Sequence, residues 1–267
     1  MEIYFNIMFF TFGLVFGSFF NVVGYRLPKG QSLLYPSSHC PNCNHELNWY
    51  ELIPVFSYLF LGCKCLKCKK KISPFYMVFE LLTGILFLMS YLVFGLSIKT
   101  IIAVTLSSIL VITMISDFLF YIIEDKVLIV GGILLIIELF IYYGYLDGSS
   151  FNIMSSLKST GFSILDGIIM FGVMYLIKLM GDFIFKKESM GGGDIKLMFI
   201  FGLTIGIINS IVTIFLASII ALPVAIIIMN LKSTHEIPFG PFLSMAALIL
   251  FFSQIDIIEL LAIWKSS

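Results

Sequence analysis

Ser189-Met190-Gly191-Gly192-Gly193-Asp194-Ile195-Lys196-Leu197 stands at the entrance of a long apolar run and places a carboxylate directly behind three glycines. An ionisable side chain at a membrane-length segment is costly unless it lies at an interface, has a partner or faces water, so it indicates a functional site. The alternative is that Asp194 only caps a helix, because Asp is among the best N-cap residues and glycines suit a turn. The rest of the chain therefore has to supply a partner for Asp194.

The composition predicts a membrane protein. Hydrophobic residues make up 60% of the chain, charged residues only 12%, and the mean hydropathy is +1.06. Soluble domains contain about 25% charged residues. The first apolar segment lacks a positively charged start and continues at spanning length, so we expect a retained transmembrane helix and no cleaved signal peptide.

Eight apolar segments approach the roughly 20 residues that a membrane-spanning helix needs. They are residues 3–25, 75–96, 99–116, 126–145, 161–185, 195–209, 210–231 and 239–264. We therefore expect an all-α polytopic membrane protein of about eight transmembrane helices, with a tight turn near Asn209-Ser210 between the sixth and the seventh. Residues 26–74 are polar, Cys-bearing and rich in Lys, which predicts a small non-membrane domain between helices 1 and 2.

The distribution of Lys and Arg predicts the orientation, because basic residues are enriched on the cytoplasmic side. With strict alternation of the spans, only Lys99, Lys158 and Lys265 lie on the side opposite to the other basic residues. We therefore expect a cytoplasmic Cys domain and both termini outside. Asp117 and Asp194 then fall at the same cytoplasmic surface.

The cysteines form two knuckles, Cys40-Pro41-Asn42-Cys43 and Cys65-Leu66-Lys67-Cys68, separated by 21 residues. This spacing is typical of zinc ribbons, in which four thiolates surround one tetrahedral ion. Disulfides are the alternative, which a reducing cytoplasm disfavours. Cys63, His39 and His45 are near enough to compete as ligands. A metal would fold a segment too small to be stable by burial alone, so we expect structural Zn²⁺.

Asp117 ends the third predicted span and is the partner that we expect for Asp194. Two carboxylates held close together share a proton, so that one serves as a base toward water and the other as an acid. That is the machinery of aspartic peptide hydrolysis, which needs no metal and no nucleophilic side chain. The chain contains no Gly-x-Ser-x-Gly and no His-Glu-x-x-His motif to compete with it. The alternative for Asp117 is a solvated helix end at the interface.

The three glycines gain a second use in this interpretation. Without side chains, Gly191, Gly192 and Gly193 let an extended substrate backbone approach Asp194 closely and let the loop move. A phosphate-binding loop is the competing interpretation, but no Gly-Lys-Ser/Thr ending follows the glycines and no strand precedes them.

Six motifs, spread in order over most of the chain, resemble those of the bacterial type IV prepilin peptidase family, the prepilin leader peptidase/N-methyltransferases. They are Gly17-Ser18-Phe19-Phe20-Asn21-Val22-Val23 with Tyr25-Arg26-Leu27-Pro28; the paired Cys knuckles; Pro54-Val55-Phe56-Ser57-Tyr58-Leu59 with Glu80-Leu81-Leu82-Thr83-Gly84; Asp117 with Asp125; Gly191-Gly192-Gly193-Asp194-Ile195-Lys196-Leu197; and Pro238-Phe239-Gly240-Pro241-Phe242-Leu243.

The resemblance implies that Asp117 and Asp194 are the catalytic pair of a peptidase in the bacterial inner membrane. The implied substrate is a type IV pilin-like precursor, cut after a Gly at the cytoplasmic edge of its own apolar helix. The implied second activity is methylation of the new N-terminus from S-adenosylmethionine. The expected organisation is a first transmembrane helix (1–25), a Cys domain containing the methylation region (26–74) and a membrane peptidase domain (75–267).

The resemblance also assigns supporting roles and shows departures. Glu80, Asp125 and Lys196 are expected to belong to the methylation region or to surround the catalytic pair. Glu124 stands where the family usually has Pro, and Phe75 and Met77 replace a common Arg and Pro. The implied partners are prepilin-like precursors and membrane lipid; no nucleic acid is expected.

Two other classes of function are possible for the same residues. A proton- or ion-coupled transporter would use Asp117, Asp194, Glu80 and Asp182 as a relay, but transporters carry such residues near the membrane midplane and often in repeated halves. Here the carboxylates gather at one predicted surface, and no repeat is visible. A non-enzymatic assembly platform would use the Cys domain as a docking surface.

Overall fold

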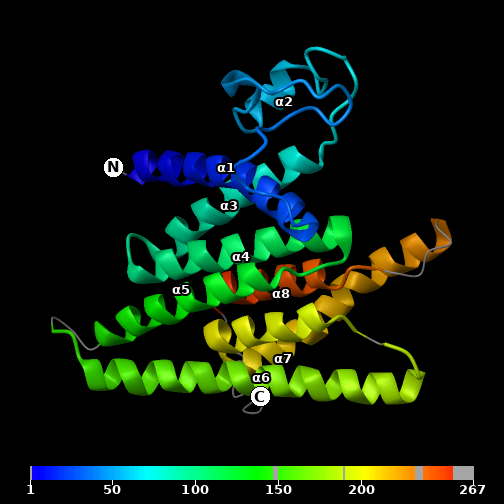
Figure 1. Ribbon diagram of the computed structural model, residues 1–267. Helices are drawn as coiled ribbons and strands as arrows, with labels where there is room; N and C mark the ends of the chain where they lie inside the picture. The colour runs from blue at the N-terminus through cyan, green and yellow to red at the C-terminus, as the bar shows by residue number, and fades with distance from the viewer. Residues whose placement is uncertain (1, 147–149, 189, 232–236, 255–267) are drawn as a thin grey trace, which may run out of the picture. The chain divides into compact units, whose positions relative to one another are not determined.

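The computed structural model describes residues 2–146, 150–188, 190–231 and 237–254, which are predominantly helical (Figure 1). The helices are α1 (Glu2–Arg26), the short 3-10 helices η1 (Leu27–Lys29) and η2 (Trp49–Glu51), α2 (Phe56–Phe60), α3 (Phe75–Phe94), α4 (Ile98–Phe120), α5 (Asp125–Gly144), α6 (Ile153–Phe185), α7 (Gly192–Leu231) and α8 (Gly240–Ser253). Within the described ranges, the only β-pairing consists of two isolated bridges, between His39 and Glu46 and between Lys64 and Lys71.

Six of the described helices are long and apolar enough to cross a membrane: α1, α3, α4, α5, α6 and α7. The shorter α8 is apolar as well, and the predicted span 239–264 continues beyond the described residues. Helix α7 is interrupted at Gly206, whose φ of 75° and ψ of 174° are not helical. If α7 is counted as two segments, the described chain has eight apolar helical segments, as predicted. The interruption lies three residues before the predicted turn at Asn209, at a residue without a Cβ.

The chain divides into two compact units, Met1–Phe120 and Tyr121–Ser267. In the first unit, small residues let α1 approach α3 closely. A Cβ added at Gly13 would lie 2.7 Å from the Cα of Gly84, and one added at Gly17 would lie 2.8 Å from the Cα of Glu80. Such Gly-x-x-x-Gly contacts allow the close packing that holds helices together in membranes. The Cys-bearing segment and α2 lie beyond the ends of α1 and α3 (Figure 1).

In the second unit, α6 and α7 lie against each other through another pair of small residues (Figure 1). A Cβ at Gly202 would lie 2.7 Å from the Cα of Gly167. Helix α6 begins at Ile153, eight residues before the predicted start at residue 161. The polar residues of its first turns obscured this start, which is set by Asn152, whose side chain accepts hydrogen bonds from the N–H groups of Met154 (3.1 Å) and Ser155 (3.2 Å).

Candidate functional site

The four predicted metal ligands come together. The sulfur atoms of Cys40, Cys43, Cys65 and Cys68 all lie within 4.8 Å of one another. The Sγ atoms of Cys40 and Cys68 are 3.8 Å apart, and those of Cys43 and Cys65 are 3.9 Å apart. A tetrahedral zinc ion with Zn–S bonds of about 2.3 Å would separate its sulfurs by about 3.8 Å, so the cluster fits such an ion.

The two knuckles have the same backbone form. The N–H of Asn44 donates to the carbonyl of Cys40 (2.9 Å), and the N–H of Lys69 donates to the carbonyl of Cys65 (3.0 Å). Asn44 and Lys69 occupy equivalent places directly after the second cysteine, and both have positive φ, at 53° and 58°. The repeated turn aims both cysteines of each knuckle at one point.

The turns also favour thiolates. Burial opposes ionisation of Cys40, but backbone hydrogen bonds from Asn42 and Cys43 outweigh it and lower the pKa of this thiol to about 7. In the second knuckle, backbone hydrogen bonds from Cys68 and Lys67 lower the pKa of Cys65, even though burial opposes them. Because the thiolate is the metal-binding form, both shifts favour a metal. A backbone hydrogen bond with His45 lowers the pKa of Cys43, but burial and the three neighbouring thiols outweigh it and raise this pKa to about 11.

The three competing ligands are engaged elsewhere. Cys63 lies outside the cluster, and its backbone pairs with the carbonyl of Tyr58 and the N–H of Ile72, each at 2.9 Å. His39 Nδ1 lies 3.0 Å from the carbonyl of Ser37. His45 Nε2 lies 3.2 Å from a carboxylate oxygen of Glu51. Over the described residues, the cluster therefore consists of the four predicted cysteines.

Glu80 connects the Cys-bearing segment to α3. Its buried carboxylate accepts a hydrogen bond from the N–H of Val55 at 2.7 Å and is also hydrogen-bonded by Ser18 of α1. Val55 has a φ of 62°, which is rare for a β-branched residue. Nothing in the sequence could reveal this bond, because it depends on the strained turn before α2. Glu80 thus lies in the region expected, but its carboxylate serves as a structural brace.

Asp117 lies in the last turn of α4 and is buried, with 6% of its surface exposed. The predicted span ended at residue 116, whereas α4 continues to Phe120. Asp117 is therefore a residue of the helix itself, and it is largely shielded from bulk solvent. This environment does not fit the alternative of a solvated helix end.

Asp194 is also buried, with 8% of its surface exposed. It is the third residue of α7, so it lies inside the first helical turn and is not the N-cap residue. The partial positive charge at a helix N-terminus favours a carboxylate there. Asp194 therefore lies at a position where its ionised form is supported although it is buried.

The three glycines have different surroundings. A Cβ at Gly193 would lie 2.5 Å from the Cβ of Ile123, in the connection between α4 and α5. A Cβ at Gly192 would meet nothing within 4 Å, and one at Gly191 would meet only a carboxylate oxygen of Asp194, at 3.9 Å. Gly193 is therefore required by packing, and open space surrounds the other two. Ile123 was missed in the sequence because its apolar side chain carries no chemical signal.

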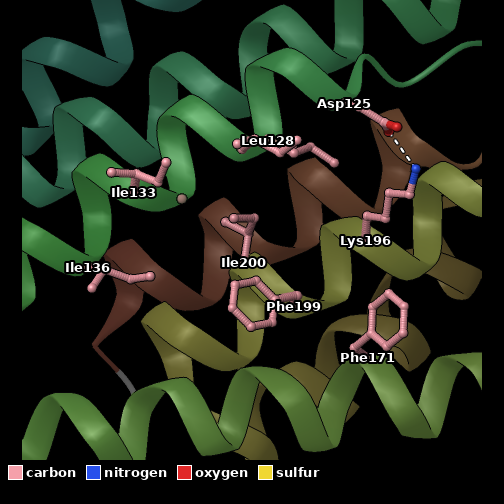
Figure 2. A pocket seen from close by; sticks show the side chains of 10 residues that line it. Asp125, Leu128, Ile133, Ile136, Phe171, Lys196, Phe199 and Ile200 are labelled. Carbon is pink, nitrogen blue, oxygen red and sulfur yellow. Dashed lines mark hydrogen bonds and ion pairs between the residues drawn. The ribbon is translucent and has the colours of Figure 1, made fainter.

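Asp125 and Lys196 form an ion pair, with 2.6 Å between Lys196 Nζ and Asp125 Oδ1. Figure 2 shows the pair at one end of an apolar groove of about 400 Å³. Asp125 is the first residue of α5, and Lys196 follows Asp194 by two residues in α7. The pair joins the starts of these two helices, about 3 Å along the axis of α7 from Asp194.

Fold and site together define a class: a helical multi-pass membrane protein with a four-cysteine cluster that could hold a metal ion and with buried carboxylates near helix ends. Residues 11–94 match the bacterial peptidase A24 N-terminal domain, and residues 103–226 match the type IV leader peptidase family. The chain belongs to the type IV leader peptidase family, which confirms the resemblance seen in its motifs.

Several relatives are named prepilin leader peptidase/N-methyltransferase. The protein of Bacillus subtilis (strain 168) is 30% identical over 87% of this chain and 88% of the relative. The protein of Neisseria gonorrhoeae is 30% identical over 90% of this chain and 87% of the relative. The protein of Pseudomonas aeruginosa (strain PAO1) is 31% identical over 88% of this chain and 85% of the relative. No solved structure matches the chain significantly.

Proposed function

We propose that this protein is a membrane-embedded aspartic endopeptidase that removes the leader of type IV prepilin-like precursors and then methylates the new N-terminus. Its relatives bear the name prepilin leader peptidase/N-methyltransferase. The observation that carries the proposal is that Asp117 and Asp194, the carboxylates of the two family motifs, are both buried at helix ends. Buried carboxylates at such positions are expensive to keep without a function.

In the proposed reaction, Asp117 and Asp194 share one proton. The ionised carboxylate takes a proton from a water molecule, whose oxygen attacks the carbonyl carbon of the scissile peptide bond. The protonated carboxyl donates to the carbonyl oxygen, which forms a tetrahedral intermediate. When the C–N bond breaks, the leaving amine takes a proton from the dyad, and the carbonyl re-forms as the leader's carboxylate.

The residue next to Asp194 is held by the connection before α5, because Ile123 lies against Gly193. We propose that the substrate backbone approaches Asp194 at Gly191 and Gly192, where space is open at the start of α7, while Gly193 fixes the packing of this end of the helix.

The proposal places the reaction at the cytoplasmic face of the bacterial inner membrane, with both termini outside, on the distribution of Lys and Arg. The four cysteines would hold one Zn²⁺, which would fold residues 26–74. S-adenosylmethionine would supply the methyl group for the new amine. One carboxylate oxygen of Glu80 accepts the N–H of Val55, and no methylation step is assigned to this residue.

Conservative substitutions test the catalytic pair. Asp117→Asn and Asp194→Asn should each lower the rate of precursor cleavage by more than about 100-fold, because neither amide can transfer the proton. Glu188→Gln removes an exposed carboxylate six residues before Asp194 and should cleave as the wild type does. Each variant must reach the membrane in wild-type amounts. Retained cleavage in both Asn variants would refute the assignment.

A further inference from the structure

Apart from the Asp125–Lys196 ion pair at one end, the groove is lined by apolar residues and Gly132. Figure 2 shows apolar residues that line it: Leu128, Ile133 and Ile136 of α5, Phe199 and Ile200 of α7, and Phe171 of α6. Its volume of about 400 Å³ falls within the range of about 300–1,000 Å³ that is typical of ligand pockets. All its lining residues belong to the second compact unit.

The groove has one polar end and one apolar end. The polar end is the Asp125–Lys196 pair, at the first residue of α5 and the fifth residue of α7. The far end is at Ile136, about 16 Å along α5 at the rise of an α-helix. The groove therefore begins at the helix ends that carry Asp194 and continues along the part of α5 that has membrane-span character.

These features fit one occupant. The substrate class that we propose is cut immediately before its own apolar helix, so a bound precursor must present polar chain at Asp194 and an apolar helix directly beyond it. A groove that starts at Lys196, two residues after Asp194, and continues apolar for about 16 Å would contact one face of about 11 residues of such a helix. The charged pair at its mouth matches the polar junction of the substrate.

We infer that this groove holds the first turns of the precursor's apolar helix, which runs from the Asp125–Lys196 pair toward Ile136. The inference rests on the proposed function and identifies the surface that holds the mature side of the cleavage site. Lipid acyl chains are the competing occupant of an apolar groove among membrane helices, and the experiments below distinguish the two.

Site-specific photo-crosslinking tests the register of the bound helix. A photoreactive amino acid is placed at Ile129 or Ile136 in the Asp194→Asn variant, which should hold a pilin-like precursor of the same genome uncut. The control position is Ile137, the exposed neighbour of Ile136 on α5 that does not line the groove. We expect Ile129 to crosslink the first turn after the cleavage site and Ile136 to crosslink about seven residues further along, while Ile137 crosslinks lipid.

Crosslinks from Ile129 and Ile136 to lipid alone, or to the precursor no more than from Ile137, would overturn the inference. Crosslinks from Ile129 and Ile136 to the same precursor residues would overturn it as well, because a helix lying along the groove must show the shift. This readout does not depend on catalytic activity.

A pair of matched substitutions provides the kinetic test. Ile133 lines the groove and Leu134 does not, although their exposed fractions are similar, at 53% and 47%. Ile133→Trp should fill the groove and raise KM for the precursor about tenfold while changing kcat less than about twofold. Leu134→Trp should leave both constants unchanged.

Equal KM values for both variants would refute the inference that the groove binds the precursor. The peptidase assignment would stay intact, provided that the wild type cleaves the precursor. If the wild type does not cleave it, the proposed function fails, and this inference fails with it.

Discussion

At the scale of single residues, the glycines before Asp194 show that one motif can contain different physical requirements. Gly193 has no room for a side chain because Ile123 lies against it, whereas Gly192 faces open space. A sequence motif marks all three glycines alike. Only the packing distinguishes Gly193, which lies against Ile123, from Gly191 and Gly192, which leave open space.

This difference predicts unequal effects on stability. Gly193→Ala would place a methyl group 2.5 Å from the Cβ of Ile123 and should destabilise the protein by about 1–3 kcal/mol, the usual cost of overpacking. Gly192→Ala meets nothing within 4 Å and should be close to neutral. Thermal unfolding in detergent measures both, and equal melting temperatures for the two variants would contradict the packing argument.

The Asp125–Lys196 pair is a residue-scale feature of a different kind. Its side chains are 56% and 46% exposed, so the ion pair is expected to contribute at most about 1 kcal/mol to stability. Its importance therefore lies in its position at the mouth of the groove, where we infer that it meets the polar end of a bound helix.

At the scale of elements, the two Cys knuckles are one turn used twice. Each has a residue of positive φ directly after its second cysteine and equivalent backbone hydrogen bonds. The sequence predicted this element fully, because the spacing of metal ligands is local along the chain. The sequence did not decide whether Cys63 is a metal ligand. In the structure Cys63 is not one of the clustered cysteines, because its backbone follows a different turn.

The knuckles predict a clear metal stoichiometry. Wild-type protein should contain about one zinc ion per chain, and Cys40→Ser should lose it, because three thiolates bind zinc more weakly than four. Cys63→Ser should retain the metal, since Cys63 lies outside the cluster. Elemental analysis of the purified proteins measures this. Zinc retained in Cys40→Ser, or lost in Cys63→Ser, would contradict the assignment.

The interruption of α7 is an element-scale feature that the sequence predicted only approximately. The hydropathy pattern predicts two consecutive spans, residues 195–209 and 210–231. It predicts the turn between them at Asn209-Ser210, where polar residues interrupt the apolar run. The structure places the break at Gly206, whose non-helical φ of 75° suits a residue without a side chain. Asn209 and Ser210 instead continue the helix.

At the scale of the whole chain, the sequence predicted the fold class and the family, because apolar length and motif order are properties of the sequence itself. The structure confirmed the helical, multi-pass character and the cysteine cluster. The brace from Glu80 to Val55, the contact of Gly193 with Ile123, and the groove between α5, α6 and α7 could not be predicted. Each depends on residues far apart in the sequence, and none has a charge pattern or a spacing that marks it.

The central claim is that Asp117 and Asp194 form the proton-sharing pair of a leader peptidase. Mass spectrometry of a precursor's N-terminus tests it most directly, after incubation of the precursor and S-adenosylmethionine with wild-type protein or with Asp194→Asn. We predict a trimmed and methylated N-terminus with the wild type and an intact precursor with the variant. A trimmed product formed by Asp194→Asn, or an intact precursor after incubation with active wild-type protein, would contradict the claim.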